Sequence, residues 1–135
     1  VAIIGVLASI AVPQYQNYTA RAQASEGLSI TAGIRSDISE QYSLRGELPT
    51  WSQLGASTES GQEGTLADIS GRYVNSVNYV SEGTGTIRVT FNEDSALDGA
   101  VMDISPAEDS NPSTGWTCSW NEKGQDSWLP AGCRE

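Results

Sequence analysis

The hydrophobic positions of the chain follow three successive patterns, and the first is an uninterrupted apolar run. Residues 1–13, VAIIGVLASIAVP, carry no charge, and only Gly5 and Ser9 break their hydrophobic character before Pro13. A membrane-spanning helix needs about 20 apolar residues, so this run is shorter than a full span. It also has neither the initial methionine nor the basic segment of an intact signal peptide. Because an exposed terminus this apolar would aggregate, we expect the run to be the remainder of a longer apolar helix whose beginning is missing.

The second pattern has the period of an amphipathic helix. Four hydrophobic residues spaced four apart predict one covered face: Ile30, Ile34, Ile38 and Tyr42. Arg45 and Gly46 supply a basic last turn and a C-cap, and Pro49 prevents continuation. A single helix over residues 1–46 would be about 69 Å long, which a domain of this size cannot bury.

The first half of this helix must therefore find partners outside its own subunit, first lipid and then copies of itself. Such a bundle is held by close packing, which small residues assist. Pro13 lacks an amide hydrogen and Gly33 has low helix propensity, so we expect helix kinks at these two residues.

The third pattern is the alternation of apolar and polar residues that half-buried strands show. Residues 86–91 alternate cleanly, with Ile87, Val89 and Phe91 on one face. Three further segments read as strands: 73–80, 100–104 and 116–120. The valines of the first fall at every third position, which leaves its register open. Turn-rich segments between the strands favour an antiparallel meander: 82–85, 92–99 and 108–115. Residues 47–71 predict a long polar surface loop, and four strands packed on the helix predict an α+β fold.

The charge of the chain narrows the function classes. The formal net charge is −10, and from Trp51 onward 13 acidic residues stand against four basic ones. Such a surface repels phosphate, so we expect no direct binding of nucleic acid. Histidine is absent, which removes the commonest general base and metal ligand, and no nucleophile has an evident base. We therefore expect neither catalysis nor a bound metal or cofactor.

The two cysteines, Cys118 and Cys133, are too few for a thiolate zinc site. Near the C-terminus of a polar chain they predict one disulfide and an oxidising compartment, with two free buried thiols as the alternative. The bond would close a 14-residue loop and stabilise the fold by about 3 kcal/mol. Trp120, Trp128 and Leu129 lie in that loop. We expect them to cover the core, whereas exposure would indicate binding to glycans or surfaces.

The N-terminal stretch carries a family resemblance. Residues 1–27 closely resemble the N-terminal helix of type IVa pilins of Gram-negative bacteria, in the pattern VAIIG-x-L-A-x-I-A-x-P-x-Y-x-x-Y-x-x-R. Residues 129–133, LPAGC, resemble the end of the family's disulfide loop, and between the two only the layout is similar. The resemblance implies the pilin fold: a long N-terminal helix on a four-stranded antiparallel sheet, with a C-terminal disulfide loop. Residues 1–27 would be the protruding assembly half of the helix and residues 28–135 the head.

The resemblance also implies a structural subunit that polymerises into a helical pilus on the cell surface. Its implied partners are copies of itself, the assembly machinery, the inner membrane before assembly, and host or abiotic surfaces. Pili of this family serve attachment, twitching motility and DNA uptake. The implied assembly residues are Val1, Ala2, Ile3, Ile4, Gly5, Val6, Leu7, Ala8, Ile10, Ala11, Val12 and Pro13.

The start of the chain departs from the family pattern. Pilins of this kind begin with a methylated phenylalanine and carry a glutamate a few residues later, and both would lie upstream of Val1. The resemblance further implies that residues 5–13 lose helical order in the filament. Proline alone predicts only a bend, and both alternatives stay open.

Two related functions share the N-terminal helix. A major pseudopilin of a type II secretion system could bind calcium through Asn92, Glu93, Asp94 and Asp98, but their spacing matches no EF-hand loop. The terminal disulfide favours a pilin over this alternative. A minor or competence pilin would resemble the major subunit in sequence.

Overall fold

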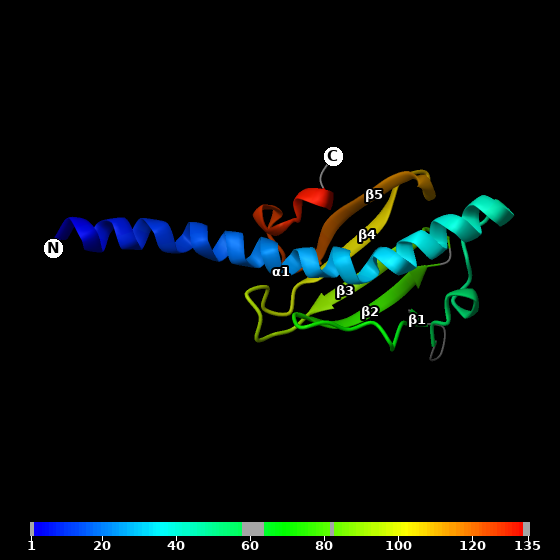
Figure 1. Cartoon of the computed structure of the whole chain (residues 1–135), viewed down its shortest axis with the longest axis horizontal. Coiled ribbons are helices and arrows are strands. Elements are labelled where there is room, and N and C mark those ends of the chain that lie inside the picture. Colours follow the sequence, from blue (N-terminus) through cyan, green and yellow to red (C-terminus); the bar gives the residue numbers. More distant parts are fainter. Residues whose placement is uncertain (1, 58–63, 82, 134–135) are drawn as a thin grey trace.

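The computed structural model describes residues 2–57, 64–81 and 83–133, and for residues 2–15 and Ser81 it describes the backbone. The elements are, in chain order, α1 (Ala2–Arg45), η1 (Ser52–Leu54), β1 (Gly64–Thr65), β2 (Val74–Ser81), β3 (Thr86–Phe91), β4 (Val101–Glu108), β5 (Asn111–Glu122), η2 (Asp126–Trp128) and η3 (Ala131–Cys133). Figure 1 shows α1 lying across one face of the sheet, while its N-terminal part extends away from the head. The predicted long helix and α+β fold are confirmed, and Val1 lies outside the described residues.

The strands form one antiparallel sheet in the order β1-β2-β3-β4-β5. The four predicted strands correspond to β2–β5, and β3 has the predicted bounds, with Ile87, Val89 and Phe91 buried. The additional strand, β1, has two residues that pair with β2 at the edge of the sheet, inside the segment predicted to be a loop.

The irregular valine spacing before β3 results from a β-bulge. Pairing between β2 and β3 shifts register between Val74 and Ser76. The extra residue on β2 changes which side chains face the helix. Val74 is therefore buried, and so are Val77 and Tyr79 farther along the same strand. Buried residues of a strand normally lie two apart, and the bulge lengthens this spacing to three between Val74 and Val77.

The β4–β5 hairpin is longer than the sequence pattern predicts. Residues 108–115 were expected to form a turn-rich gap, but β4 continues to Glu108 and β5 begins at Asn111. Asp109 and Ser110 have φ angles of +47° and +56°, as two-residue hairpin turns of type I′ require. A register shift between Pro106 and Glu108 accommodates the extra residues of β5. This prediction was wrong because local turn propensity gave way to strand pairing.

The helix packs on the sheet mainly through small residues, and of the predicted isoleucines Ile38 alone is fully buried. Along this inner face the fully buried residues are Ala20, Ala24, Thr31 and Ile38. Gly27 lies so close to the sheet that an added Cβ would come within 3.0 Å of Phe91 and 3.3 Å of Val89 and Met102. Of the predicted stripe, Ile38 is fully buried, but Ile30 and Ile34 are only partly buried against the core. The large side chains of the sheet fill the space, so the centre of the helix face must be small.

The predicted C-cap is confirmed. Gly46 has φ +74°, and its amide donates to the carbonyl of Tyr42 at 2.8 Å, which ends α1 in the left-handed conformation that glycine adopts without strain. Upstream, the helical backbone runs through Pro13 and Gly33 without a break. A kink at either residue stays a prediction.

Candidate assembly surface and its anchoring contacts

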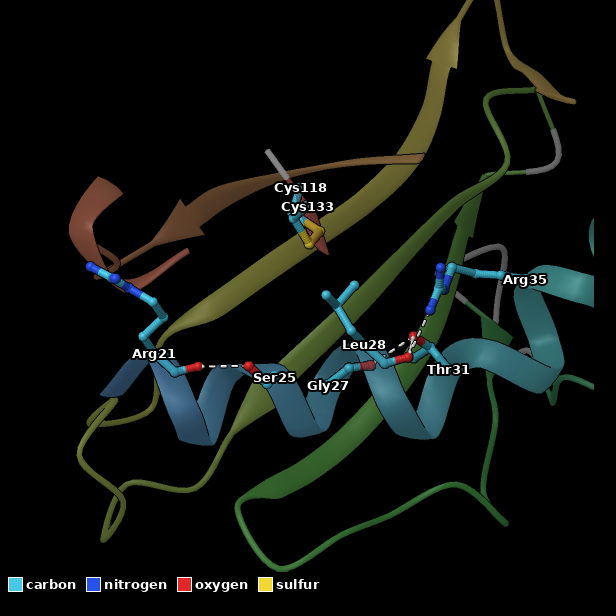
Figure 2. The surroundings of a disulfide bond; sticks show 8 residues. All are labelled: Arg21, Ser25, Gly27, Leu28, Thr31, Arg35, Cys118 and Cys133. Carbon is cyan, nitrogen blue, oxygen red and sulfur yellow. Dashed lines mark hydrogen bonds between the residues drawn. A yellow bond between two sulfur atoms is a disulfide. The ribbon is translucent and has the colours of Figure 1, made fainter. Parts of the chain in front are cut away.

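The segment of α1 that enters the head is tied to the C-terminal loop. Arg21 donates from Nε and Nη2 to the carbonyl of Ser127, at 3.0 and 2.9 Å. One turn earlier, Asn17 Oδ1 accepts from Trp128 Nε1 at 3.2 Å. Figure 2 shows the Arg21 side chain reaching from α1 toward this loop. These bonds hold η2 against the helix. They are the most N-terminal of the described side-chain hydrogen bonds between α1 and the head.

Two further polar residues of α1 hold the other loops at this end of the head. Glu26 accepts from the consecutive amides of Arg72 and Tyr73, at 2.6 and 2.7 Å. Gly71 precedes them, and a Cβ there would overlap the Glu26 carboxylate. Gln23 Oε1 accepts from the amide of Ala96 at 2.8 Å, in the turn between β3 and β4. Sequence reasoning did not find these contacts, because the bonded residues are far apart along the chain.

We call these four residues of α1 the anchor residues: Asn17, Arg21, Gln23 and Glu26. Together they bind three separate segments of the head with side-chain hydrogen bonds to groups 46 to 111 residues away. Charge-assisted hydrogen bonds are about twice as strong as neutral ones, so the Arg21 and Glu26 contacts contribute most. The anchor residues bind α1 to the head next to the point where the N-terminal part of the helix extends away from it.

The predicted disulfide is formed. Cys118 of β5 and Cys133 of η3 are bonded, with their Cα atoms 5.0 Å apart, and Figure 2 shows the bond above α1. The loop that it closes carries η2, so the disulfide and two of the anchor residues, Asn17 and Arg21, hold the same segment. Two tryptophans of this loop form an aromatic cluster with Phe91 of β3: Trp120 is 6.0 Å from Phe91 and 6.2 Å from Trp128 between ring centroids.

The tryptophans of the loop cover the core, as predicted. Trp120, Trp128 and Leu129 are partly buried and pack against the hydrophobic cluster of the head. Aromatic pairs in tilted or edge-on geometry contribute about 0.5–1.5 kcal/mol beyond their area burial. The aromatic cluster therefore contributes to the stability of the head.

The predicted assembly residues fall on the protruding part of α1. Residues 2–13 lie in continuous helix, and Figure 1 shows this part beyond the sheet and the loops. Val1 lies outside the description, and the side chains of residues 2–13 are not described. No helix in the described parts of the chain combines enough length with enough apolar character to cross a membrane.

The opposite side of α1 within the head faces solvent. Between Tyr18 and Glu40 the exposed residues are Ala22, Ser25, Ser29, Ala32, Gly33 and Ser36, which we call the outer face. Two large hydrophobic side chains are exposed beyond its ends, Tyr18 at 73% and Leu44 at 78%. The outer face carries no charge although the chain has a net charge of −10.

Arg35 of α1 is partly buried, as is Arg21, but it is bonded less completely. Arg35 donates from Nη2 to the carbonyl of Leu28 at 2.8 Å, as Figure 2 shows, while its Nε is buried without a hydrogen-bond partner in the described structure. Burial lowers the pKa of the Arg35 guanidinium because it desolvates the charged form. Burial of this charge therefore opposes folding. By contrast, Arg88 pairs with Asp103 across β3 and β4 through two bonds of 2.7 and 2.9 Å.

The residues proposed for calcium have structural roles or face solvent. Asn92 donates from Nδ2 to the carbonyl of Arg72, and its own carbonyl accepts from the amides of Ser95 and Gly99. Glu93 and Asp94 are exposed in the turn that follows. Among the described residues, no three histidine, cysteine or carboxylate side chains are grouped so that they could hold a metal ion.

Comparison with known proteins decides the family. A family model described as pilin, a bacterial filament, matches residues 20–134, which is most of the chain. The chain belongs to the pilin family. A pilin is a structural filament subunit and not an enzyme, so this chain assembles with other subunits into an extracellular pilus.

Individual relatives agree with this pilin assignment. The chain is 34% identical over 138 residues to the fimbrial protein EcpC of Eikenella corrodens, covering 99% of this chain and 83% of that protein. It is 34% identical over 135 residues to a fimbrial protein of Pseudomonas aeruginosa, covering 96% and 84%. It is 37% identical over 92 residues to the type IV major pilin protein PilE1 of Neisseria gonorrhoeae, covering 68% of this chain but 47% of that protein.

Proposed function

We propose that this pilin is a major subunit of a type IV pilus and polymerises through residues 1–13 of its N-terminal helix. The observation that carries the proposal is the length of α1 compared with the head. Its 44 residues extend about 66 Å, whereas its described side chains first bond to the head at Asn17. Figure 1 shows the N-terminal part of the helix extending away from the rest of the subunit.

The chemistry of the protruding segment explains how copies hold together. It carries no charge, so other copies of the same segment can surround it without burying an ion. Gly5, Ala8 and Ala11 are small and allow helices to approach closely where water is excluded. Before assembly the same segment would rest in the inner membrane, from which the assembly machinery would take it.

The relatives' printed names support the pilus over the other candidates. They are called fimbrial proteins and a type IV major pilin, and a major pilin makes up the shaft. Attachment, twitching motility and DNA uptake are the activities we propose for the assembled fibre. No described contact favours a secretion pseudopilin. Calcium titration of the folded chain should therefore leave its melting temperature unchanged, whereas sub-millimolar binding that raised it would favour that alternative.

Electron microscopy of filaments sheared from the native cells, with mass spectrometry of their main component, tests the proposal. We expect this chain to be the main component. The variant Leu7→Glu, which introduces a charge into the protruding segment, should abolish the filaments, because burial of an unpaired charge is costly.

Leu44→Glu is the matched control, because it makes the same change on the same helix at a residue that is already 78% exposed. Filaments should persist in this variant. Wild-type filaments made of another protein, or filaments that survive Leu7→Glu, would contradict the proposal. Loss of filaments in both variants would contradict the assignment of assembly to residues 1–13.

A further inference from the structure

Two parts of α1 differ in what holds them. Residues 2–16 are helical, but the first described side-chain bond between α1 and the head is at Asn17. Pro13 has no amide to donate to the carbonyl of Ser9, so the helix lacks one of its own hydrogen bonds there. An isolated helix of about 12–15 residues is marginal in water. Under tension, residues 2–16 are therefore the part of α1 that should lose helical structure first.

Between Asn17 and Gly27 the helix is attached to the head more by polar bonds than by apolar packing. The fully buried hydrophobic residues of this stretch are Ala20 and Ala24, whose side chains are single methyl groups. Among the described side chains of α1, the first hydrophobic one larger than alanine that packs on the core is Leu28. The stability gained from apolar burial follows the area buried, so this stretch gains little from it. The anchor residues supply the attachment instead: Asn17, Arg21, Gln23 and Glu26.

The anchor residues lie on both sides of the contact between α1 and the sheet. Successive residues of a helix are about 100° apart around its axis. Asn17 and Arg21 therefore lie on one side of the two buried alanines, and Gln23 and Glu26 lie on the other. A helix must turn about its axis as it unwinds, and bonds on both sides oppose this turn.

The groups that the anchor residues bind are themselves tied to the sheet. Arg21 bonds to the loop that the disulfide closes onto β5. Glu26 accepts from the amides of Arg72 and Tyr73, just before β2. Asn92, which follows β3, donates from its amide to the carbonyl of Tyr73 and from Nδ2 to the carbonyl of Arg72. A pulling force on α1 is therefore shared among several strands.

From these contacts we propose that the anchor residues form a stop in α1. When the chain is pulled from its N-terminal end, the loss of helical structure halts at Asn17 and the head stays folded. Parts of one chain open separately when their stabilities differ in this way. In a filament under tension, the protruding segment would lengthen without exposing the core of the head. This mechanical role rests on the proposed function, whereas the stop itself belongs to a single subunit.

Optical tweezers on the single full chain in mild detergent test the stop. The handles are attached through Ala2→Cys, on the protruding segment, and Ser113→Cys, at an exposed position of β5. A residue that passes from helix to extended chain gains about 1.9 Å. We expect a first step of about 30 Å in contour length, which corresponds to residues 2–16. A second step should follow at higher force, when the head unfolds.

Removal of the anchor residues should lengthen the first step. Asn17→Ala with Arg21→Ala moves the expected stop to Gln23, for a first step of about 40 Å. Alanine at all four anchor residues moves it to Leu28, for a first step of about 50 Å. The matched control should keep the wild-type step, because it changes four polar residues of α1 whose side chains have no described bond to the head: Gln16→Ala, Ser25→Ala, Ser29→Ala and Ser36→Ala.

A wild-type chain that unfolds in one step, or whose first step already measures about 50 Å, would overturn the proposal. Both outcomes are read on the wild type, so they do not depend on the folding of a variant. Unchanged first steps in the anchor variants would overturn it too, since core packing would then halt the unwinding. So would an equally long first step in the control, because helix composition would then set the boundary. Wild-type filaments that lack this chain would instead refute the proposed function and leave the stop in place.

Discussion

The two sides of α1 differ in how their small residues are explained. On the inner face, Ala20, Ala24 and Gly27 are small because the sheet lies directly against them. On the outer face, residues of similar size are exposed to solvent. The comparison teaches that packing can require small residues on one side of a helix while the other side of the same helix carries them without such a requirement. The inner face serves the folding of the subunit, and the outer face does not.

Removal of the disulfide should have the largest effect on the free energy of unfolding of the head. The double variant Cys118→Ser with Cys133→Ser frees the loop that carries η2 and should lower the free energy of unfolding by about 3 kcal/mol, because the unfolded chain gains entropy. Urea unfolding of the full chain in mild detergent would measure this change. The wild type with reductant is the control and should match the variant; an unchanged midpoint would show that the anchor residues hold the loop alone.

The next largest effect is expected from Gly27→Leu. The added side chain must displace Phe91, Val89 or Met102, and overpacking of this kind costs about 1–3 kcal/mol. The same urea experiment would show a lower midpoint. Gly33→Leu, the same substitution on the outer face, should not lower it. A similar loss in both variants would remove the distinction between the two faces.

Loss of an anchor residue should have a smaller effect. Glu26→Ala removes the acceptor for two amides and should cost about 1–2 kcal/mol, because hydrogen bonds to a charged group are stronger but this one is partly exposed to water. Hydrogen exchange should accelerate at Arg72 and Tyr73 while it stays slow in β3. Glu26→Gln keeps one oxygen acceptor and should lie between the two; exchange rates equal to the wild type in Glu26→Ala would contradict the role of this residue.

The smallest effect has the opposite sign. Gly33→Ala should raise the free energy of unfolding by up to about 1 kcal/mol, because alanine has the higher helix propensity and meets no neighbour. Thermal unfolding in detergent would measure the increase. A decrease in stability would mean that Gly33 has a structural role in the subunit and would weaken the comparison of the two faces.

Local signals predicted much of the fold. Gly46 and Pro49 mark the end of α1, and the alternation over residues 86–91 gives β3 its bounds, because neighbours along the chain determine both. The pair of cysteines also predicted the disulfide. The register of β2 was not predictable, because a bulge after Val74 changes the phase of the pattern.

The contacts of the helix with the head depend on distant residues and could not be read from the sequence. Four evenly spaced isoleucine and tyrosine residues predicted the covered face, but Gly27, which has no side chain, also lies on this face, so close to the sheet that an added Cβ would press on Phe91. Arg21 and Glu26 appeared as ordinary polar residues, because Ser127 and Arg72 become their neighbours only in the folded chain. The outer face could not be predicted from the sequence either, because the exposure of its residues depends on the fold.

Cross-linking of Leu7→Cys in intact filaments with a bifunctional maleimide most directly tests whether the protruding segments of different copies lie against one another. The native cysteines are bonded to each other, so the introduced thiol is the one that reacts with a maleimide. We expect covalent oligomers from the filaments and monomers from the chain dispersed in detergent, because the segments pack closely only in the filament. Monomers alone from intact filaments would contradict the account.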